Sequence, residues 1–120
     1  MYVRRLNECP EVVAGDRTRL RELLHPDRNP VAIRYSLARA RLGPRQKSLS
    51  HRLTASEAYY FIQGQGVMHI NEDRQTVWAG DVVYVPPGAM QWLENIGGEP
   101  IEFLCIVDPA WQLEQEELTD

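Results

Sequence analysis

The residues with the clearest chemical potential are a histidine and a glutamate on either side of a short polar turn. His51 lies just before the turn at 54–56 and Glu57 lies just after it. The two side chains can therefore face each other from adjacent antiparallel strands. An imidazole and a carboxylate held on rigid strands can share a divalent metal ion. Gln91 can add an amide oxygen as a third ligand, which gives the donor set of an open non-haem iron site.

Two other interpretations of these residues stay open. An amide oxygen is a poorer ligand than imidazole, so His51 and Glu57 also suit a metal-free pocket in which they hydrogen-bond a ligand or each other. The third interpretation is a structural barrel whose polar residues satisfy one another. Without a metal, Glu57 is a candidate general base, because burial in an apolar barrel raises the pKa of a carboxyl group toward the working pH.

Other side chains near this pair have simpler expected roles. Tyr59 shares the parity of Glu57 along its strand and is the candidate for orienting a substrate, although core packing also explains it. Cys105, on the last strand, is expected as a small buried thiol. His69 is expected on the outer face of its strand, and His25, which precedes a proline, in an exposed loop.

The segments that must position these residues alternate in polarity with a period of two, which is typical of half-buried β-strands. Glycine- and proline-rich turns separate them, and seven or more short strands of this kind indicate a β-sandwich or barrel. The expected strands cover 18–24, 31–42, 49–53, 57–62, 67–70, 76–78, 82–85, 90–94 and 101–107.

The tail, residues 109–120, is the one segment with helical character. Asp108 is a possible N-cap, and Pro109 stands at the first helical position. The sequence therefore predicts a short C-terminal helix whose glutamates form a solvated face.

Residues 80–95 carry a spacing that resembles a known family motif. The second motif of the cupin superfamily is G(X)5PXG(X)2H(X)3N, and this chain matches it at Gly80, Pro86, Gly88 and Asn95. Gln91 stands where the family has a metal-binding histidine.

A partial match to the first cupin motif, G(X)5HXH(X)3–4E(X)6G, lies upstream. His51, Glu57 and Gly64 stand at three of its positions. Leu53 replaces the second histidine, and Arg45 replaces the first glycine. Most of the matched residues specify turn geometry, so they predict shape more firmly than chemistry.

The chain thus resembles small single-domain cupins of the conserved-barrel type, with a degenerate set of metal ligands. The resemblance implies an all-β jelly-roll barrel, or double-stranded β-helix, that forms a homodimer. It also implies a metal-dependent enzyme, such as an isomerase or oxygenase, acting on a small sugar- or keto-acid-like substrate. His51, Glu57 and Gln91 would hold the ion (Fe, Mn, Ni, Cu or Zn), and Tyr59 would orient the substrate. The alternative is a non-catalytic module that binds or senses a small molecule without metal.

Length and composition set the remaining expectations. A chain of 120 residues forms one domain, with a lead-in at 1–16, the barrel at 17–108 and the helical tail at 109–120. The net charge of −4 argues against nucleic-acid binding, which favours a basic face. No apolar run approaches the roughly 20 residues needed to span a bilayer. With no secretory signal and only two distant cysteines, the protein is expected in the cytoplasm.

Overall fold

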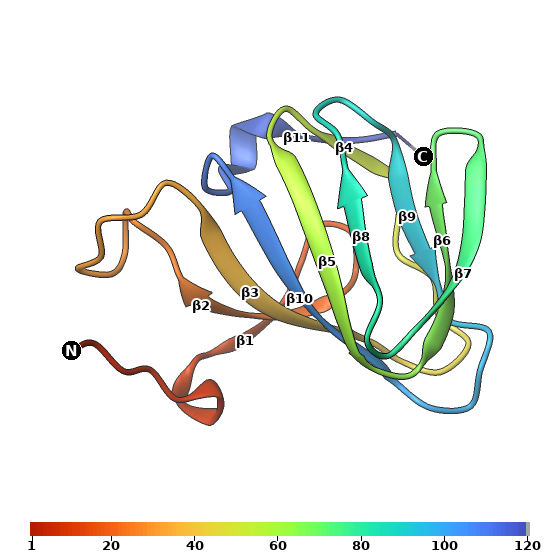
Figure 1. The fold of residues 1–120 in the computed structure, drawn as a ribbon, viewed down its shortest axis with the longest axis horizontal. Helices are drawn as coiled ribbons and strands as arrows, with labels where there is room; N and C mark the ends of the chain where they lie inside the picture. Colours follow the sequence, from red (N-terminus) through yellow and green to blue (C-terminus); the bar gives the residue numbers. More distant parts are fainter. Residues whose placement is uncertain (120) are drawn as a thin grey trace.

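Two antiparallel sheets that face each other make up the protein in a computed structural model that describes residues 1–119 (Figure 1). One sheet has six strands in the order β1-β2-β3-β10-β5-β8, and the other has five in the order β11-β4-β9-β6-β7. The strands are β1 (Glu11–Val13), β2 (Arg19–Leu24), β3 (Ser36–Leu42), β4 (His51–Leu53), β5 (Ser56–Gln63), β6 (Gln65–Ile70), β7 (Asp73–Trp78), β8 (Val82–Val85), β9 (Gln91–Glu94), β10 (Ile101–Asp108) and β11 (Glu116–Leu118).

The sandwich forms because its strands alternate buried and accessible side chains. In β10, Ile101, Phe103, Cys105 and Val107 point inward and are buried, whereas Ile106 points outward and is exposed. The prediction of an all-β jelly roll is confirmed. The expected closed barrel is not, because no pairing among the described strands joins one sheet to the other.

The hydrophobic core fills one end of the sandwich. Phe61 and Phe103 lie with their ring centroids 5.6 Å apart, and Leu42, Leu93 and Ile101 pack in the same cluster. Complete burial of each such side chain contributes about 1.5–3 kcal/mol. This packed end holds the sheets together and leaves the opposite end, where β10 finishes and β5 begins, free for polar side chains.

Two glycines of the predicted motifs are required by the backbone. Gly64 connects β5 to β6 with a φ of 92°, and a Cβ atom there would lie 2.7 Å from the carbonyl oxygen of Pro100. Gly80, in the turn before β8, has a φ of 94°. Any other residue would be strained in this left-handed region, so these positions fix the two turns.

The predicted C-terminal helix is wrong. Residues 113–115 form a single 3-10 turn, and β11 then pairs antiparallel with β4; Asp120 lies outside the described residues. Asp108 ends β10 instead of capping a helix, and the Ala110 amide donates to the Arg34 carbonyl at 2.7 Å. The edge of β4 offers backbone partners along its whole length, which a marginal helix of about 12 residues cannot match.

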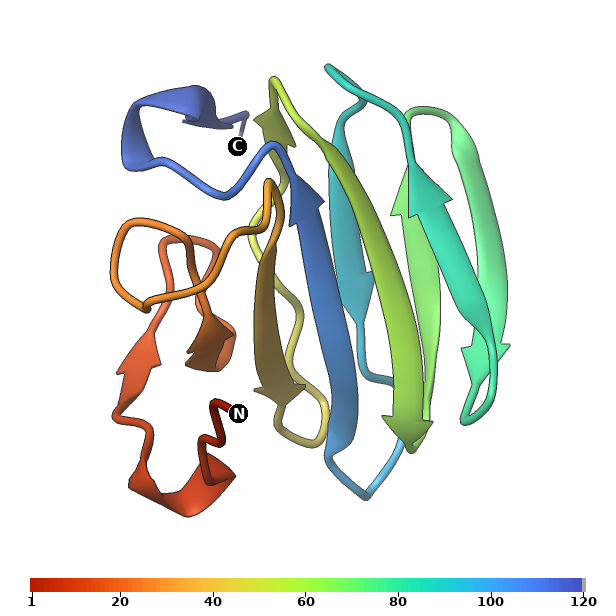
Figure 2. The same cartoon turned by 60° about the vertical axis from the view of Figure 1, so that its left-hand side comes forward.

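The N-terminal lead-in is more structured than expected. A 3-10 turn at Leu6–Glu8 is followed by β1, which pairs with β2 at the edge of the larger sheet. Figure 2 shows that this segment and the C-terminal tail lie on the same side of the molecule. No helix within residues 1–119 is long and apolar enough to cross a membrane.

The outer face of the larger sheet exposes a continuous apolar patch. Cross-strand pairing sets Tyr60 beside Val82, and Ala58 beside both Tyr84 and Ile106. Each of these side chains except Ala58 is at least two-fifths exposed. A sheet with two apolar faces needs a partner for the outer one, so the homodimer implied by the family resemblance stays a prediction with this patch as its interface.

We expect Tyr84→Arg to convert a dimer of the 13.8 kDa chain into a monomer, because a charge at the centre of an apolar interface costs about 2 kcal/mol or more. Light scattering coupled to size exclusion measures the mass. Ile96→Arg, at an exposed apolar residue between β9 and β10, is the matched control and should leave the mass unchanged. A wild-type chain that is monomeric at high concentration contradicts the prediction.

Candidate functional site

A cavity of about 650 Å³ lies at the end of the sandwich that the core leaves free. Its volume is within the range of small-molecule sites. Strands of both sheets, the N-terminal segment and the C-terminal tail contribute to its walls, which are largely apolar. The main apolar side chains are Leu20, Leu53, Tyr59, Phe103, Val107 and Trp111.

The polar residues singled out by sequence come together at this end. His51 of β4 and Gln91 of β9 are cross-strand partners, and Glu57 lies on β5 of the facing sheet. The three are 3%, 1% and 7% exposed, respectively. His51 and Glu57 line the cavity. The strands that hold the three residues are among those that the sequence predicted. Along each strand the residue falls on the same alternating face as the buried side chains next to it.

The imidazole of His51 is fixed in one tautomer when neutral. Its Nδ1 lies 3.0 Å from the carbonyl oxygen of Leu49 and 4.0 Å from Oδ2 of Asp16. A carbonyl can only accept a hydrogen bond, so Nδ1 carries the proton. Nε2, which then carries a lone pair, has no hydrogen-bond partner among residues 1–119.

Gln91 and Tyr59 form a buried hydrogen bond with each other. The Tyr59 hydroxyl donates to Oε1 of Gln91. Burial raises the pKa of Tyr59 well above its ordinary value, so the phenol keeps its proton and remains the donor. The Tyr59 ring stacks on Phe103 with centroids 5.1 Å apart, which holds the hydroxyl in place. The amide oxygen of Gln91 is therefore already engaged.

Glu57 is buried, and one of its carboxyl oxygens has no hydrogen-bond partner among the described residues. Its Oε1 is the one buried side-chain nitrogen or oxygen atom among the described residues that has no hydrogen-bond partner. Burial raises the pKa of Glu57 to about 7, and the negative charge of Asp16 acts in the same direction. His51, the Gln91 amide and the Cys105 thiol lower it and only partly compensate. The carboxyl group thus changes protonation state near neutral pH.

Leu53 occupies the position of the second motif histidine and belongs to the cavity wall. It is buried and packs with Ala55, Val107 and Trp111 in a small apolar cluster. Among residues 1–119, no group of three or more histidine, cysteine, aspartate or glutamate side chains is arranged to hold a metal ion. The metal-binding role of His51, Glu57 and Gln91 stays a prediction.

Sequence reasoning missed two carboxylates of the cavity. Asp16 was expected in the lead-in, but its Oδ1 accepts hydrogen bonds from the amide and the hydroxyl of Thr18, at 3.0 and 2.7 Å, and its other oxygen faces His51. The Asp-x-Thr spacing is a weak signal for such a turn. Glu116 was expected on a solvated helix, but it lies on β11 opposite Leu53. Nothing in the sequence distinguishes it from the other acids of the tail.

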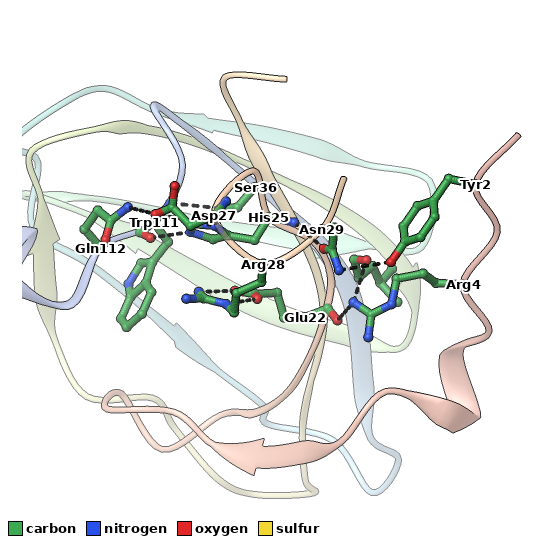
Figure 3. A network of polar contacts seen from close by, with 11 residues as sticks. Tyr2, Arg4, Glu22, His25, Asp27, Arg28, Asn29, Ser36, Trp111 and Gln112 are labelled. Atoms are coloured by element: carbon green, nitrogen blue, oxygen red, sulfur yellow. Dashed lines mark hydrogen bonds and ion pairs between the residues drawn. The ribbon is translucent and has the colours of Figure 1, made fainter. Parts of the chain in front are cut away.

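The prediction of an exposed His25 is also wrong, because this side chain is 0% exposed. It connects the 25–30 loop to the C-terminal tail (Figure 3). Its Nε2 donates to the Trp111 carbonyl at 2.8 Å, and its Nδ1 accepts from the Asp27 amide at 3.1 Å. The Gln112 side chain bonds Oδ2 of Asp27 at 2.9 Å. These contacts hold Trp111 in the cavity wall.

Comparison with known proteins gives one family and several relatives. Residues 38–107 match the cupin domain. The chain is 34% identical over 109 residues to an uncharacterised protein of Methanocaldococcus jannaschii, covering 90% of this chain and 86% of that one. It is 37% identical over 51 residues to an oxalate-binding protein of Thermotoga maritima, covering 42% of each. A solved structure of a predicted oxalate decarboxylase from Thermotoga maritima superposes with a TM-score of 0.79 at 25% identity, covering 90% of this chain and 99% of that one.

The burial of Glu57 predicts how stability depends on pH. Its pKa is near 4.5 unfolded and about 7 folded, so its contribution to stability is complete below pH 4.5 and is lost as pH rises through 7. The loss amounts to about 3 kcal/mol, since each pKa unit corresponds to about 1.4 kcal/mol. We expect Glu57→Gln to remove this part of the pH dependence and to exceed wild type in stability above pH 7.

Urea unfolding at a series of pH values between 4.5 and 8.5 measures the effect. Glu72→Gln, at an exposed acid in the β6–β7 turn, is the control and should follow the wild-type profile. Parallel profiles for wild type and Glu57→Gln would show that the carboxyl group is solvated in the folded protein.

Proposed function

This chain belongs to the cupin family, and we propose that it is a metal-independent pocket for a small, largely apolar molecule that donates a hydrogen bond to Glu57. The observation that carries the proposal is that Glu57, whose buried Oε1 has no hydrogen-bond partner, lines a cavity of about 650 Å³. A buried acceptor without a partner is destabilising by about 1–3 kcal/mol, so a ligand that donates to it recovers that free energy on binding.

The donor set does not fit the divalent metal that the family resemblance implies. Leu53 has no donor atom, and Oε1 of Gln91 accepts the Tyr59 hydroxyl hydrogen bond. One of the two lone pairs of that amide oxygen is thus already used, and coordination by Gln91 would depend on the other. The motif positions then supply one imidazole, one carboxylate and this weaker amide donor, and no group of three histidine, cysteine, aspartate or glutamate side chains within residues 1–119 is arranged to hold a metal ion.

The same arrangement supports proton exchange between Glu57 and the bound molecule. A carboxyl group with a pKa of about 7 both donates and accepts protons near neutral pH, which is the property of an efficient general acid–base. Nε2 of His51 supplies a second acceptor on the facing sheet. Tyr59 has an indirect role, because its hydroxyl donates to Gln91 and so orients the Gln91 amide beside Glu57.

The first test is binding in the presence of EDTA. Ligand-observed NMR with a library of small aromatic alcohols and amides should give hits that need no added metal. We expect Glu57→Leu, which keeps most of the volume but removes the acceptor, to weaken these hits at least about tenfold, the effect of losing one hydrogen bond to a charged group.

Glu72→Leu, which removes an exposed acid far from the cavity, should bind as wild type does. Binding that appears only after addition of a transition metal, or that is indifferent to Glu57→Leu, would overturn the proposal.

The second test asks for the metal directly. We expect protein purified without a nickel column to contain less than about a tenth of an equivalent of any transition metal, because too few donors converge. Restoring two motif histidines in Leu53→His/Gln91→His should raise Co²⁺ affinity at least about a hundredfold, since each ligand contact exceeds the 1.4 kcal/mol that corresponds to tenfold.

Adding His51→Ala to the double variant is the matched control and should abolish the gain. If the wild-type protein instead contains one equivalent of a transition metal that dialysis does not remove, the result supports the metal-dependent enzyme.

A further inference from the structure

We infer, on the basis of the proposed pocket, that its ligand carries a protonated amine on an apolar body. The cavity lining includes three carboxyl groups, those of Asp16, Glu57 and Glu116, together with the imidazole of His51, which lies beside Asp16. Because Oε1 of Glu57 is buried without a partner, this cluster contains an acceptor that no described residue satisfies. An ammonium group supplies both the donor and the compensating charge.

Asp16 acts on both of the other carboxyl groups, although the three come from distant segments of the chain. Glu116 pairs with Leu53 across β11 and β4, and so shares the inward face with His51. Oδ2 of Asp16 lies 4.0 Å from Nδ1 of His51. The charge of Asp16 raises the pKa of both Glu57 and Glu116, after the larger effect of burial. Their mutual repulsion is relieved by a cation placed among them.

The two arginines of the cavity, Arg4 and Arg28, have partners of their own (Figure 3), and neither is among the groups that shift the pKa of Glu57 or Glu116. Arg28 forms a paired hydrogen bond with both oxygens of Glu22, at 2.5 and 2.8 Å. Nη1 of Arg4 donates to the carbonyl oxygens of Glu22 and Leu23, at 3.3 and 3.0 Å. Neither arginine therefore compensates the charge of Asp16, Glu57 or Glu116.

The apolar side chains that line the rest of the cavity suit the apolar part of such a ligand. Tyr59, Phe103 and Trp111 offer aromatic surface, and aromatic faces attract cations as well as hydrocarbon. A dianion of the kind named for the Thermotoga maritima relative, oxalate, would meet three carboxyl groups here. The charge arrangement therefore selects against that ligand in this chain.

Three probes of nearly equal size separate charge from shape: 2-phenylethylamine, 2-phenylethanol and phenylacetate. Titration calorimetry at pH 7.5 with EDTA should give the amine at least about tenfold tighter binding than the alcohol, and no measurable binding of the anion. Asp16→Asn and Glu116→Gln should each weaken the amine about tenfold and leave the alcohol unchanged, because each removes one charge at a distance. Glu72→Gln is the control for surface charge and should change neither.

The outcomes separate this inference from the function on which it rests. Equal affinity of amine and alcohol, or tighter binding of phenylacetate, overturns the amine while the metal-independent pocket stands. Failure of all three probes, in a protein that circular dichroism shows to be folded, overturns both. Binding of the amine that survives Asp16→Asn and Glu116→Gln together shows that the carboxyl cluster does not select it.

Discussion

The open end of the sandwich is organised around a carboxyl group that is buried with one oxygen unpartnered. Glu57 is held between two neighbours in the sheet, Val85 of β8 and Val107 of β10, and its side chain is buried on the inner face with them. In the core, Phe61 and Phe103 of this sheet pack with Met68 and Leu93 of the other, which holds the two sheets together. The carboxyl group therefore keeps its raised pKa for as long as the sandwich remains folded.

The segments outside the central strands determine what surrounds this group. β1 and the turn that holds Asp16 close one side of the cavity, and the tail with Trp111 closes the other. His25 joins the 25–30 loop to the tail through the hydrogen bond from its Nε2 to the Trp111 carbonyl, while its Nδ1 accepts from the Asp27 amide within the loop. Segments near the two ends of the sequence thus both contribute to the cavity lining. Their side chains give this cavity its acidic interior and aromatic lining.

The fold could be predicted from the sequence because local chemistry decides it. Gly64 and Gly80 occupy turns that require a positive φ, and period-two alternation marks most of the strands correctly. The tail could not be predicted, since pairing of β11 with β4 depends on an edge that exists only in the folded protein. For the same reason local patterns placed His25 in solvent, whereas its ring is satisfied by the Trp111 carbonyl, 86 residues away.

Part of the site could be predicted from the sequence, namely the residues that match the family motif. The environment of the two residues that depart from it could not. His51 and Glu57 could be placed together because one turn separates them, but the partners of Leu53 and Gln91 depend on the facing sheet. Leu53 packs on Val107 and Trp111, which turns a ligand position into apolar wall.

The Gln91 amide is engaged by Tyr59, which turns the other ligand position into a support for the polar network. Each substitution would weaken a metal site if it stood alone. Together with the burial of Glu57 they leave its Oε1 without a partner among the described residues, and this is the reason for proposing a hydrogen-bond donor, in place of a coordinated metal, as the ligand.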